Sequence, residues 1–134
     1  MSAPDWSALV AAATAAQANA YAPYSRYQVG CALLADDGRV FVGANCENAS
    51  FPLGLCAERA AMAAAVTAGA RAFLACAIVT PGPGAGSPCG GCRQVLRELG
   101  PTFPVRCVAR TGETVDFDRD ALLPGAFSPS DLPR

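Results

Sequence analysis

Segments with helical periodicity alternate with short apolar runs of strand length along this sequence. The expected helices lie between Asp5 and Pro23, over 56–68 and over about 91–99; the expected strands are 27–34, 40–44, 73–79, 104–109 and 114–117, with a last helical turn at 118–123. A tight turn at Asp37-Gly38 joins the first two strands into a hairpin. This order is typical of an α/β domain with helices on both faces of its sheet. We therefore predict a three-layer α/β/α sandwich with a mixed five-stranded sheet, formed by residues 1–134 as one domain.

Composition excludes several classes of protein. The chain is 52% apolar and 16% charged, which argues against disorder, and its longest apolar run, 72–79, is far shorter than the roughly 18 residues of a membrane span. Asp5 interrupts the N-terminus and the first basic residue is Arg26, so no signal peptide is expected. Ten basic residues face eleven acidic ones without a basic run, which disfavours nucleic-acid or membrane partners. We expect a soluble, cytoplasmic protein with a small, neutral partner.

The sequence has no histidine and seven cysteines. Without histidine the chain cannot form a Ser-His-Asp triad, a Cys-His nucleophile or an imidazole metal site. An odd number of cysteines in a reducing compartment is a poor basis for a disulfide framework and a better one for metal binding or catalysis. Any metal must therefore be held by cysteine.

Three cysteines mark the starts of two predicted helices. Cys89 and Cys92 are three residues apart, and Cys56 begins the preceding helix. Three thiolates leave the fourth position of a zinc ion open for water, as in catalytic sites, whereas structural sites are filled by four protein ligands. The remaining cysteines lie in or beside apolar strands and are expected to pack as small hydrophobic side chains: Cys31, Cys46, Cys76 and Cys107. The pattern predicts a catalytic zinc site.

Two charged residues follow Cys56. On a helical start, Glu58 can reach past the ligand to take a proton from water and deliver it to a leaving group, although a glutamate taken alone would be an ordinary first-turn residue. Three thiolates give the zinc site a net negative charge, which the helix N-termini and an arginine bonded to a thiolate would offset. Arg59 is our candidate for that arginine, with a solvated side chain as the alternative. Arg93 is interpreted as a solvated side chain on a helix face.

Five sequence blocks become specific when they are taken together in order: residues 21–25, 45–49, 56–59, 88–94 and 122–127. They resemble the small homotetrameric cytidine deaminases of pyrimidine salvage, and the resemblance covers nearly the whole chain. The zinc deaminases share a His-x-Glu signature followed by Pro-Cys-x-x-Cys. Cys56 stands in place of that histidine, which is the all-cysteine variant of the signature.

The resemblance implies a mechanism. Zinc is held by Cys56, Cys89 and Cys92, and Glu58 activates the water that attacks C4 of the cytosine ring. Glu58 also protonates the ring nitrogen and then the departing amine. The products expected from cytidine and 2'-deoxycytidine are uridine and 2'-deoxyuridine, with ammonia.

The resemblance also implies contacts to the substrate. Asn45 and Glu47 bind the ribose hydroxyls, and the backbone of Ala57 meets the base carbonyl. An amide and a carboxylate two residues apart at a strand end suit a diol, because they offer a donor and acceptors on one side. For Asn45, a role in capping the loop is the alternative.

The resemblance also implies roles for three aromatic residues. Tyr27 stands where the family generally has phenylalanine against the base, so its added hydroxyl needs a partner. Phe51 replaces a tyrosine that commonly reaches the sugar from a neighbouring subunit. Phe127 matches a C-terminal aromatic that closes over a neighbour's site. A homotetramer with shared active sites is therefore expected.

Other functions compete with this one. A blasticidin-type deaminase shares the zinc signature, and a nucleic-acid deaminase would need a cationic channel that an acidic chain does not favour. A non-catalytic module in which zinc only links helices would need a fourth protein ligand. A dithiol redox protein using Cys89 and Cys92 would leave Cys56 and Glu58 unexplained.

Overall fold

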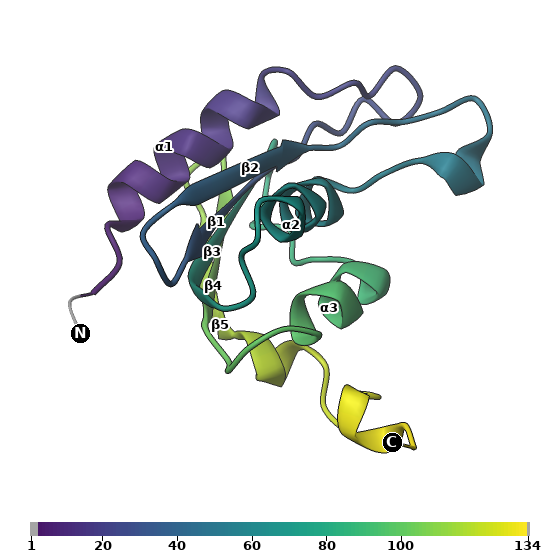
Figure 1. Cartoon of the computed structure of the whole chain (residues 1–134). Helices are drawn as coiled ribbons and strands as arrows, with labels where there is room; N and C mark the ends of the chain where they lie inside the picture. Colours follow the sequence, from purple (N-terminus) through teal and green to yellow (C-terminus); the bar gives the residue numbers. More distant parts are fainter. Residues whose placement is uncertain (1–2, 134) are drawn as a thin grey trace.

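Residues 3–133 are described by a computed structural model and form a five-stranded mixed sheet between two layers of helices (Figure 1). The strands are β1 (Gly30–Ala35), β2 (Val40–Ala44), β3 (Phe73–Thr80), β4 (Pro104–Ala109) and β5 (Thr114–Asp118). The α-helices are α1 (Trp6–Gln17), α2 (Ala57–Thr67) and α3 (Gly90–Arg97), and short 3-10 turns lie at η1 (Phe51–Leu53), η2 (Arg119–Leu122) and η3 (Pro129–Asp131). Helix α1 covers one face of the sheet, and α2 and α3 cover the other (Figure 1). The predicted α/β/α sandwich is confirmed.

The strand order is β2-β1-β3-β4-β5. Strand β1 pairs antiparallel with both β2 and β3, β3 pairs parallel with β4, and β4 pairs antiparallel with β5. The connection from β3 to β4 contains α3, which is the crossover that a parallel pair requires. The end of β3 therefore leads through the 81–89 loop to the start of α3.

Two glycines set how closely the helices approach the sheet. A Cβ atom on Gly30 would lie 1.9 Å from the Ala13 carbonyl oxygen of α1, and one on Gly43 would lie 2.5 Å from the Ala57 carbonyl oxygen of α2. Only residues without a side chain permit such contacts. The second contact matters for function, because it presses the first turn of α2 against β2. In residues 3–133 no helix combines the length and the hydrophobicity that crossing a membrane would need.

Two predicted boundaries were wrong, and both lie between α1 and β1. Helix α1 ends at Gln17 rather than near Pro23, and β1 starts at Gly30 rather than at Tyr27. The Gln17 amide donates to the Gln28 carbonyl at 3.0 Å, so that backbone group is satisfied by a side chain and not by a neighbouring strand. Since such bonds join residues far apart in sequence, local periodicity does not reveal them.

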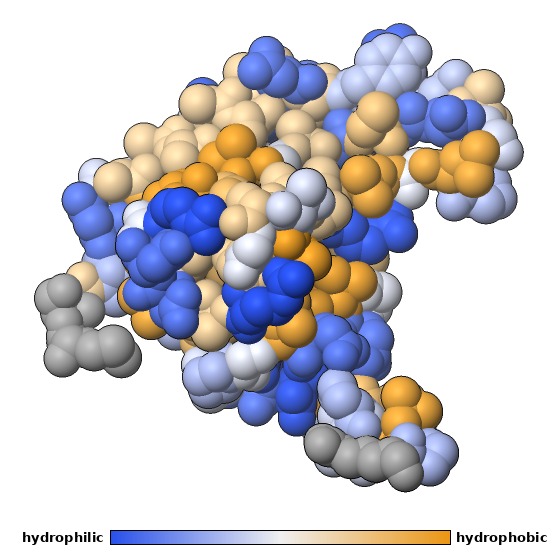
Figure 2. Space-filling view, in the orientation of Figure 1, coloured by the Kyte–Doolittle hydropathy of each residue, from blue (hydrophilic) through white to orange (hydrophobic). Residues whose placement is uncertain are grey.

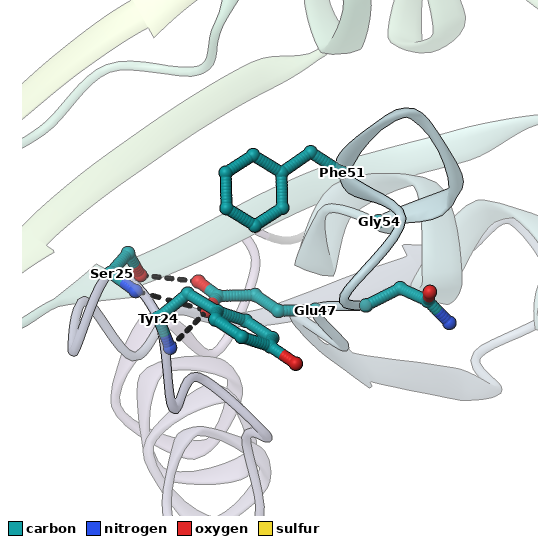
Figure 3. A pocket seen from close by; sticks show the side chains of 6 residues that line it. Tyr24, Ser25, Glu47, Phe51 and Gly54 are labelled. Carbon is teal, nitrogen blue, oxygen red and sulfur yellow. Dashed lines mark hydrogen bonds between the residues drawn. The ribbon is translucent and has the colours of Figure 1, made fainter.

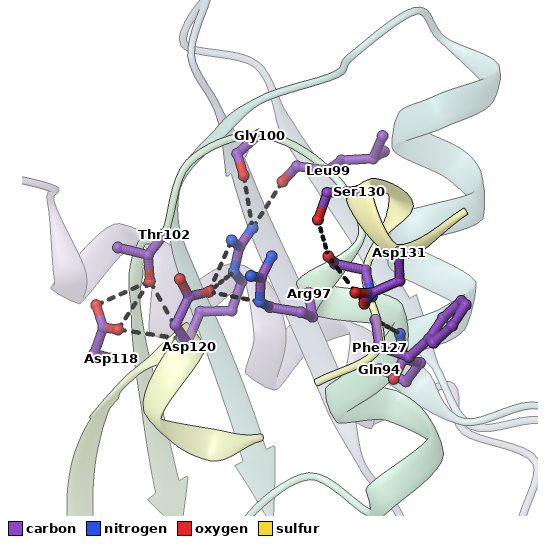
Figure 4. A network of polar contacts seen from close by, with 12 residues as sticks. Gln94, Arg97, Leu99, Gly100, Thr102, Asp118, Asp120, Phe127, Ser130 and Asp131 are labelled. Carbon is purple, nitrogen blue, oxygen red and sulfur yellow. Dashed lines mark hydrogen bonds and ion pairs between the residues drawn. The ribbon is translucent and has the colours of Figure 1, made fainter. Parts of the chain in front are cut away.

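The segment after β5 is fastened to the end of α3 by a polar network (Figure 4). Arg119 is only 2% exposed, and its Nη1 donates to the carbonyls of Leu99 at 2.7 Å and Gly100 at 3.2 Å. Its Nε donates to the Asp120 carboxylate at 2.9 Å. These bonds hold η2 in a defined place beside α3.

Across the other face, Arg106 joins three elements. Its guanidinium lies 4.3 Å from the centre of the Trp6 ring and donates to the Asp116 carboxylate at 2.8 and 2.9 Å. The Arg106 hydrogen bonds hold the pKa of the Asp116 carboxyl below its usual value. The pair thus ties the start of α1 to β4 and β5.

We expect Asp116→Asn to lower the free energy of unfolding by less than about 1 kcal/mol at neutral pH, because the pair is exposed and screened by solvent. A lowered carboxyl pKa stabilises the fold above the unfolded value of about 3.9, and this stabilisation is lost as the pH falls through the folded-state pKa. Urea denaturation at neutral and acidic pH checks this. A difference between variant and wild type that grows on acidification would contradict it.

Candidate active site

The starts of α2 and α3 bring three thiols together. Cys56 and Cys89 are the N-cap residues of the two helices, and Cys92 lies in the first turn of α3. Their Sγ atoms all lie within 4.8 Å of one another, with 4.0 Å between Cys56 and Cys89. A tetrahedral zinc ion with Zn–S bonds of about 2.3 Å separates its sulfurs by about 3.8 Å, so the cluster fits zinc. Within residues 3–133 no other group of three such ligand side chains is so placed.

Electrostatics around the thiols favour a bound cation. Burial opposes ionisation of Cys89, but hydrogen bonds from the backbone and side chain of Cys92 bring the pKa of the Cys89 thiol below its ordinary value. Burial and the negative charge of Glu58 raise the pKa of the Cys92 thiol. Three thiolates beside a carboxylate repel one another, and a divalent cation removes that repulsion.

Glu58 and Arg59 both lie against the cluster. Glu58 is 5% exposed, burial raises the pKa of its carboxyl, and a contact with Cys92 opposes that rise. Nη2 of Arg59 donates to the Gly54 carbonyl at 2.9 Å and lies 4.0 Å from the Cys56 sulfur. The site therefore places a buried carboxylate and a guanidinium beside the thiols.

A cavity of about 300 Å³ opens beside the cluster. Its lining residues come from the 25–29 loop, the end of β2, the start of α2, the end of β3 and the loop before α3: Ser25, Tyr27, Val29, Asn45, Glu47, Cys56, Ala57, Glu58, Ile78, Thr80, Ser87 and Cys89. Lysine and arginine are absent from this lining. The cavity thus gathers most of the sequence-predicted residues, and the additions are Ser25, Val29, Ile78, Thr80 and Ser87. Of these, Ser25 lies in the 21–25 block and Ser87 directly precedes Pro88-Cys89, so both carried a sequence signal.

Asn45 and Glu47 both hold the loop that forms one wall of this cavity. Asn45 accepts from the Val29 N–H at 2.9 Å through Oδ1 and donates to the Tyr27 carbonyl at 2.8 Å through Nδ2. Glu47 accepts from the backbone N–H groups of Tyr24 and Ser25, both at 3.0 Å, and from the Ser25 hydroxyl (Figure 3). The Ser25 hydroxyl holds the pKa of the Glu47 carboxyl below its usual value.

Phe51 and Phe127, the two other aromatic residues that the resemblance singled out, do not line this cavity. Phe51 is 72% exposed on the arm between β2 and α2, and its ring packs edge-on against Tyr24 with 5.5 Å between centroids (Figure 3). Phe127 is 58% exposed, and its carbonyl accepts from the Gln94 side chain at 2.8 Å. Apolar side chains gather on the projecting arm and near the C-terminus (Figure 2).

Two further interpretations from the sequence were wrong. Cys46 is exposed rather than part of the core, because its backbone pairs with Tyr21 and Leu55 and directs its side chain outward, whereas the three other strand cysteines are buried as predicted. Arg93 is half-buried rather than solvated, and it donates to Pro88, Leu122 and Ser87.

A three-thiol metal site at two helix starts, next to a buried carboxylate, defines the class of zinc-dependent hydrolytic deaminases. The family described as "Cytidine and deoxycytidylate deaminase zinc-binding region" matches residues 5–108. The chain therefore belongs to the cytidine and deoxycytidylate deaminase family, and its cofactor is zinc.

The chain is similar in sequence to known cytidine deaminases over nearly their whole length. The chain is 47% identical over 135 residues to a cytidine deaminase of Mycobacterium tuberculosis, covering 97% of this chain and 95% of the relative. It is 44% identical over 125 residues to a cytidine deaminase of Sporosarcina psychrophila, covering 92% of each. The crystal structure of cytidine deaminase from Burkholderia pseudomallei matches with a TM-score of 0.87 and 48% identity, over 90% of this chain and 98% of that one.

Proposed function

We propose that this chain, as a single domain, is a cytidine deaminase that hydrolyses cytidine and 2'-deoxycytidine to the corresponding uridines and ammonia. The observation that carries the proposal is the three-thiol cluster beside the buried Glu58, next to a cavity of about 300 Å³ that Cys56, Glu58 and Cys89 help to line. The relatives named above are cytidine deaminases at 44% and 47% identity, which supports the same reaction here.

Cys56, Cys89 and Cys92 hold the zinc. The chemistry that bound zinc supplies is the acidification of a water molecule. Glu58 takes one proton from the attacking water and passes it to the ring nitrogen next to C4. It then takes the second proton from the hydroxyl added at C4 and gives it to the leaving amine, so that the C4 carbonyl forms as ammonia departs. Its burial suits both roles, because burial raises the pKa of the Glu58 carboxyl and makes its carboxylate a stronger proton acceptor than an exposed glutamate. Arg59 offsets the negative charge of the thiolates through Cys56.

The lining of the cavity favours a neutral nucleoside over a nucleotide. Glu47 and Glu58 place two carboxylates in it, and no lysine or arginine lines it. A 5'-phosphate there would meet negative charge without a cationic partner. The same argument disfavours a nucleic-acid substrate.

The expected contacts to the sugar and base use hydrogen-bond donors and acceptors of the lining residues that are not already occupied within the protein. The Asn45 amide uses one hydrogen and one lone pair on the loop, which leaves one of each for a ribose hydroxyl, and Glu47 contributes acceptors. The Tyr27 ring stacks on the base, and the backbone of Ala57 meets the base carbonyl.

The decisive test is the loss of ultraviolet absorbance of cytidine mixed with purified protein. Activity is expected, and it should disappear on chelation and return with zinc. Deoxycytidine, cytidine monophosphate and blasticidin S are compared in parallel. Absence of turnover by the zinc-loaded protein would overturn the proposal.

We expect Glu47→Gln to raise the KM for cytidine about tenfold with a smaller effect on kcat, because the amide accepts fewer hydrogen bonds from the loop and sugar. Steady-state kinetics measure this. Asp37→Asn is the matched control, since Asp37 also caps an exposed turn, at Arg39, outside the cavity. An unchanged KM for Glu47→Gln would contradict the sugar-binding role.

We further propose a cytoplasmic homotetramer in which Phe51 and Phe127 reach neighbouring active sites. Their exposure, 72% and 58%, and the apolar arm support this (Figure 2). Light scattering should give four chains. In a mixture, inactive Glu58→Gln subunits that retain Phe127 should partly restore the activity of Phe127→Ala subunits; no restoration would contradict shared sites.

A further inference from the structure

Arg93 uses its guanidinium group for hydrogen bonds to three separate backbone or hydroxyl oxygens. Nε donates to the Pro88 carbonyl at 2.8 Å, Nη1 to the Leu122 carbonyl at 2.9 Å and Nη2 to the Ser87 hydroxyl at 2.9 Å. Within residues 3–133 it forms no ion pair with a carboxylate. The planar guanidinium group therefore holds three oxygen atoms in fixed positions and does not neutralise a carboxylate.

The bond from Nε fixes the backbone directly before Cys89, because the Pro88 carbonyl immediately precedes that residue. The Cys89 carbonyl itself accepts from the backbone N–H of Arg93 at 3.0 Å, a helix bond that does not involve the Arg93 side chain. Cys89 is exposed, so packing does not restrain it, whereas Cys92 is buried within α3. Of the two thiols on this helix, Cys89 depends more on its backbone being held.

The Leu122 carbonyl, which accepts from Arg93, belongs to a segment that is itself held in place. Leu122 ends η2, and buried Arg119 at the start of η2 is bonded to Leu99 and Gly100 (Figure 4). Arg93 thus ties the loop before Cys89 to a segment that is itself fastened to the end of α3.

We propose that Arg93 is a positioning residue: it sets the place of the Cys89 ligand and, through Ser87, the adjacent wall of the cavity. The proposal rests on the proposed function above. A partner that orients a metal ligand changes metal affinity or activity by about 10- to 100-fold when it is removed.

The test compares Arg93→Lys and Arg93→Gln with the wild type. The zinc-loaded proteins are challenged with a chromophoric chelator, and the cobalt-substituted proteins are examined by absorption spectroscopy. We expect zinc release about 10- to 100-fold faster and an altered cobalt–thiolate spectrum in both variants, because lysine keeps the charge but cannot bond to three oxygens at once. Arg71→Gln is the matched control: Arg71 donates to the Val66 and Ala70 carbonyls beyond the other end of α2.

The outcomes are distinct. Release rates and spectra like those of the wild type in both variants, with an active wild type, would overturn this inference alone. If Arg93→Lys alone keeps the wild-type zinc release rate and cobalt spectrum, the positive charge at this position is sufficient, and the positioning role is also overturned. A wild type that binds no zinc would overturn the proposed function instead. Ser87→Ala, which removes one bond outside the helix, should raise the KM for cytidine with zinc release unchanged; an unchanged KM would contradict the role of Ser87.

Discussion

Replacing Glu58 by glutamine is expected to lower kcat for cytidine by about 10²- to 10⁴-fold while zinc remains bound. The amide has nearly the shape of the carboxyl, so the packing around this 5%-exposed side chain is kept. It cannot accept and return a proton, and that transfer is what the proposed reaction asks of this residue. Since the zinc ligands are unchanged, metal content should match the wild type.

Elemental analysis and steady-state kinetics on the same preparation check this pair of results. Glu98→Gln is the matched control, because Glu98 is an exposed glutamate at the end of α3 with no side-chain partner among the described residues. It should leave both readouts unchanged. A Glu58→Gln protein that turns over cytidine at the wild-type rate would contradict the proton-transfer role. If Glu58→Gln loses its zinc, Glu58→Asp is compared with the wild type for metal content and rate instead.

The three-thiol cluster was predictable because each of its signals is local. The Cys89–Cys92 spacing places two sulfurs at one helix start, and Cys56 marks another. That Cys56 meets the other two across 33 residues was inferred from residue type and the need for a third zinc ligand. The length of α2 was predictable for the same reason: Gly69, with φ +96°, ends the helix where the sequence indicates.

What the sequence did not predict depends on bonds between distant segments. Tyr27 and Val29 lie in an apolar run, yet their backbone groups bond to Asn45 rather than to a strand. The helical position of Arg93 was predictable, but not that the Leu122 carbonyl would lie opposite it, because that contact spans 29 residues. Periodicity reports which side of an element is buried, and not which polar groups meet across it.

Replacing Cys92 by serine is expected to abolish zinc binding and with it cytidine turnover. Cys92 is fully buried, and a serine hydroxyl in its place is a poor ligand for zinc, which leaves only two thiols in the cluster. Ligand binding to the folded state alone raises stability by mass action, so added zinc should raise the Tm of the metal-free wild type and leave that of Cys92→Ser unchanged.

Differential scanning calorimetry with and without zinc measures this response, and elemental analysis gives the metal content. Cys46→Ser is the matched control, since Cys46 is exposed and lies outside the cluster; it should keep zinc, activity and the zinc-dependent rise in Tm. If Cys92→Ser retained stoichiometric zinc, the metal would have to be held by other groups, and the assignment of the ligands would be wrong. If instead the wild type showed no shift in Tm with zinc, the cluster would not be a zinc site.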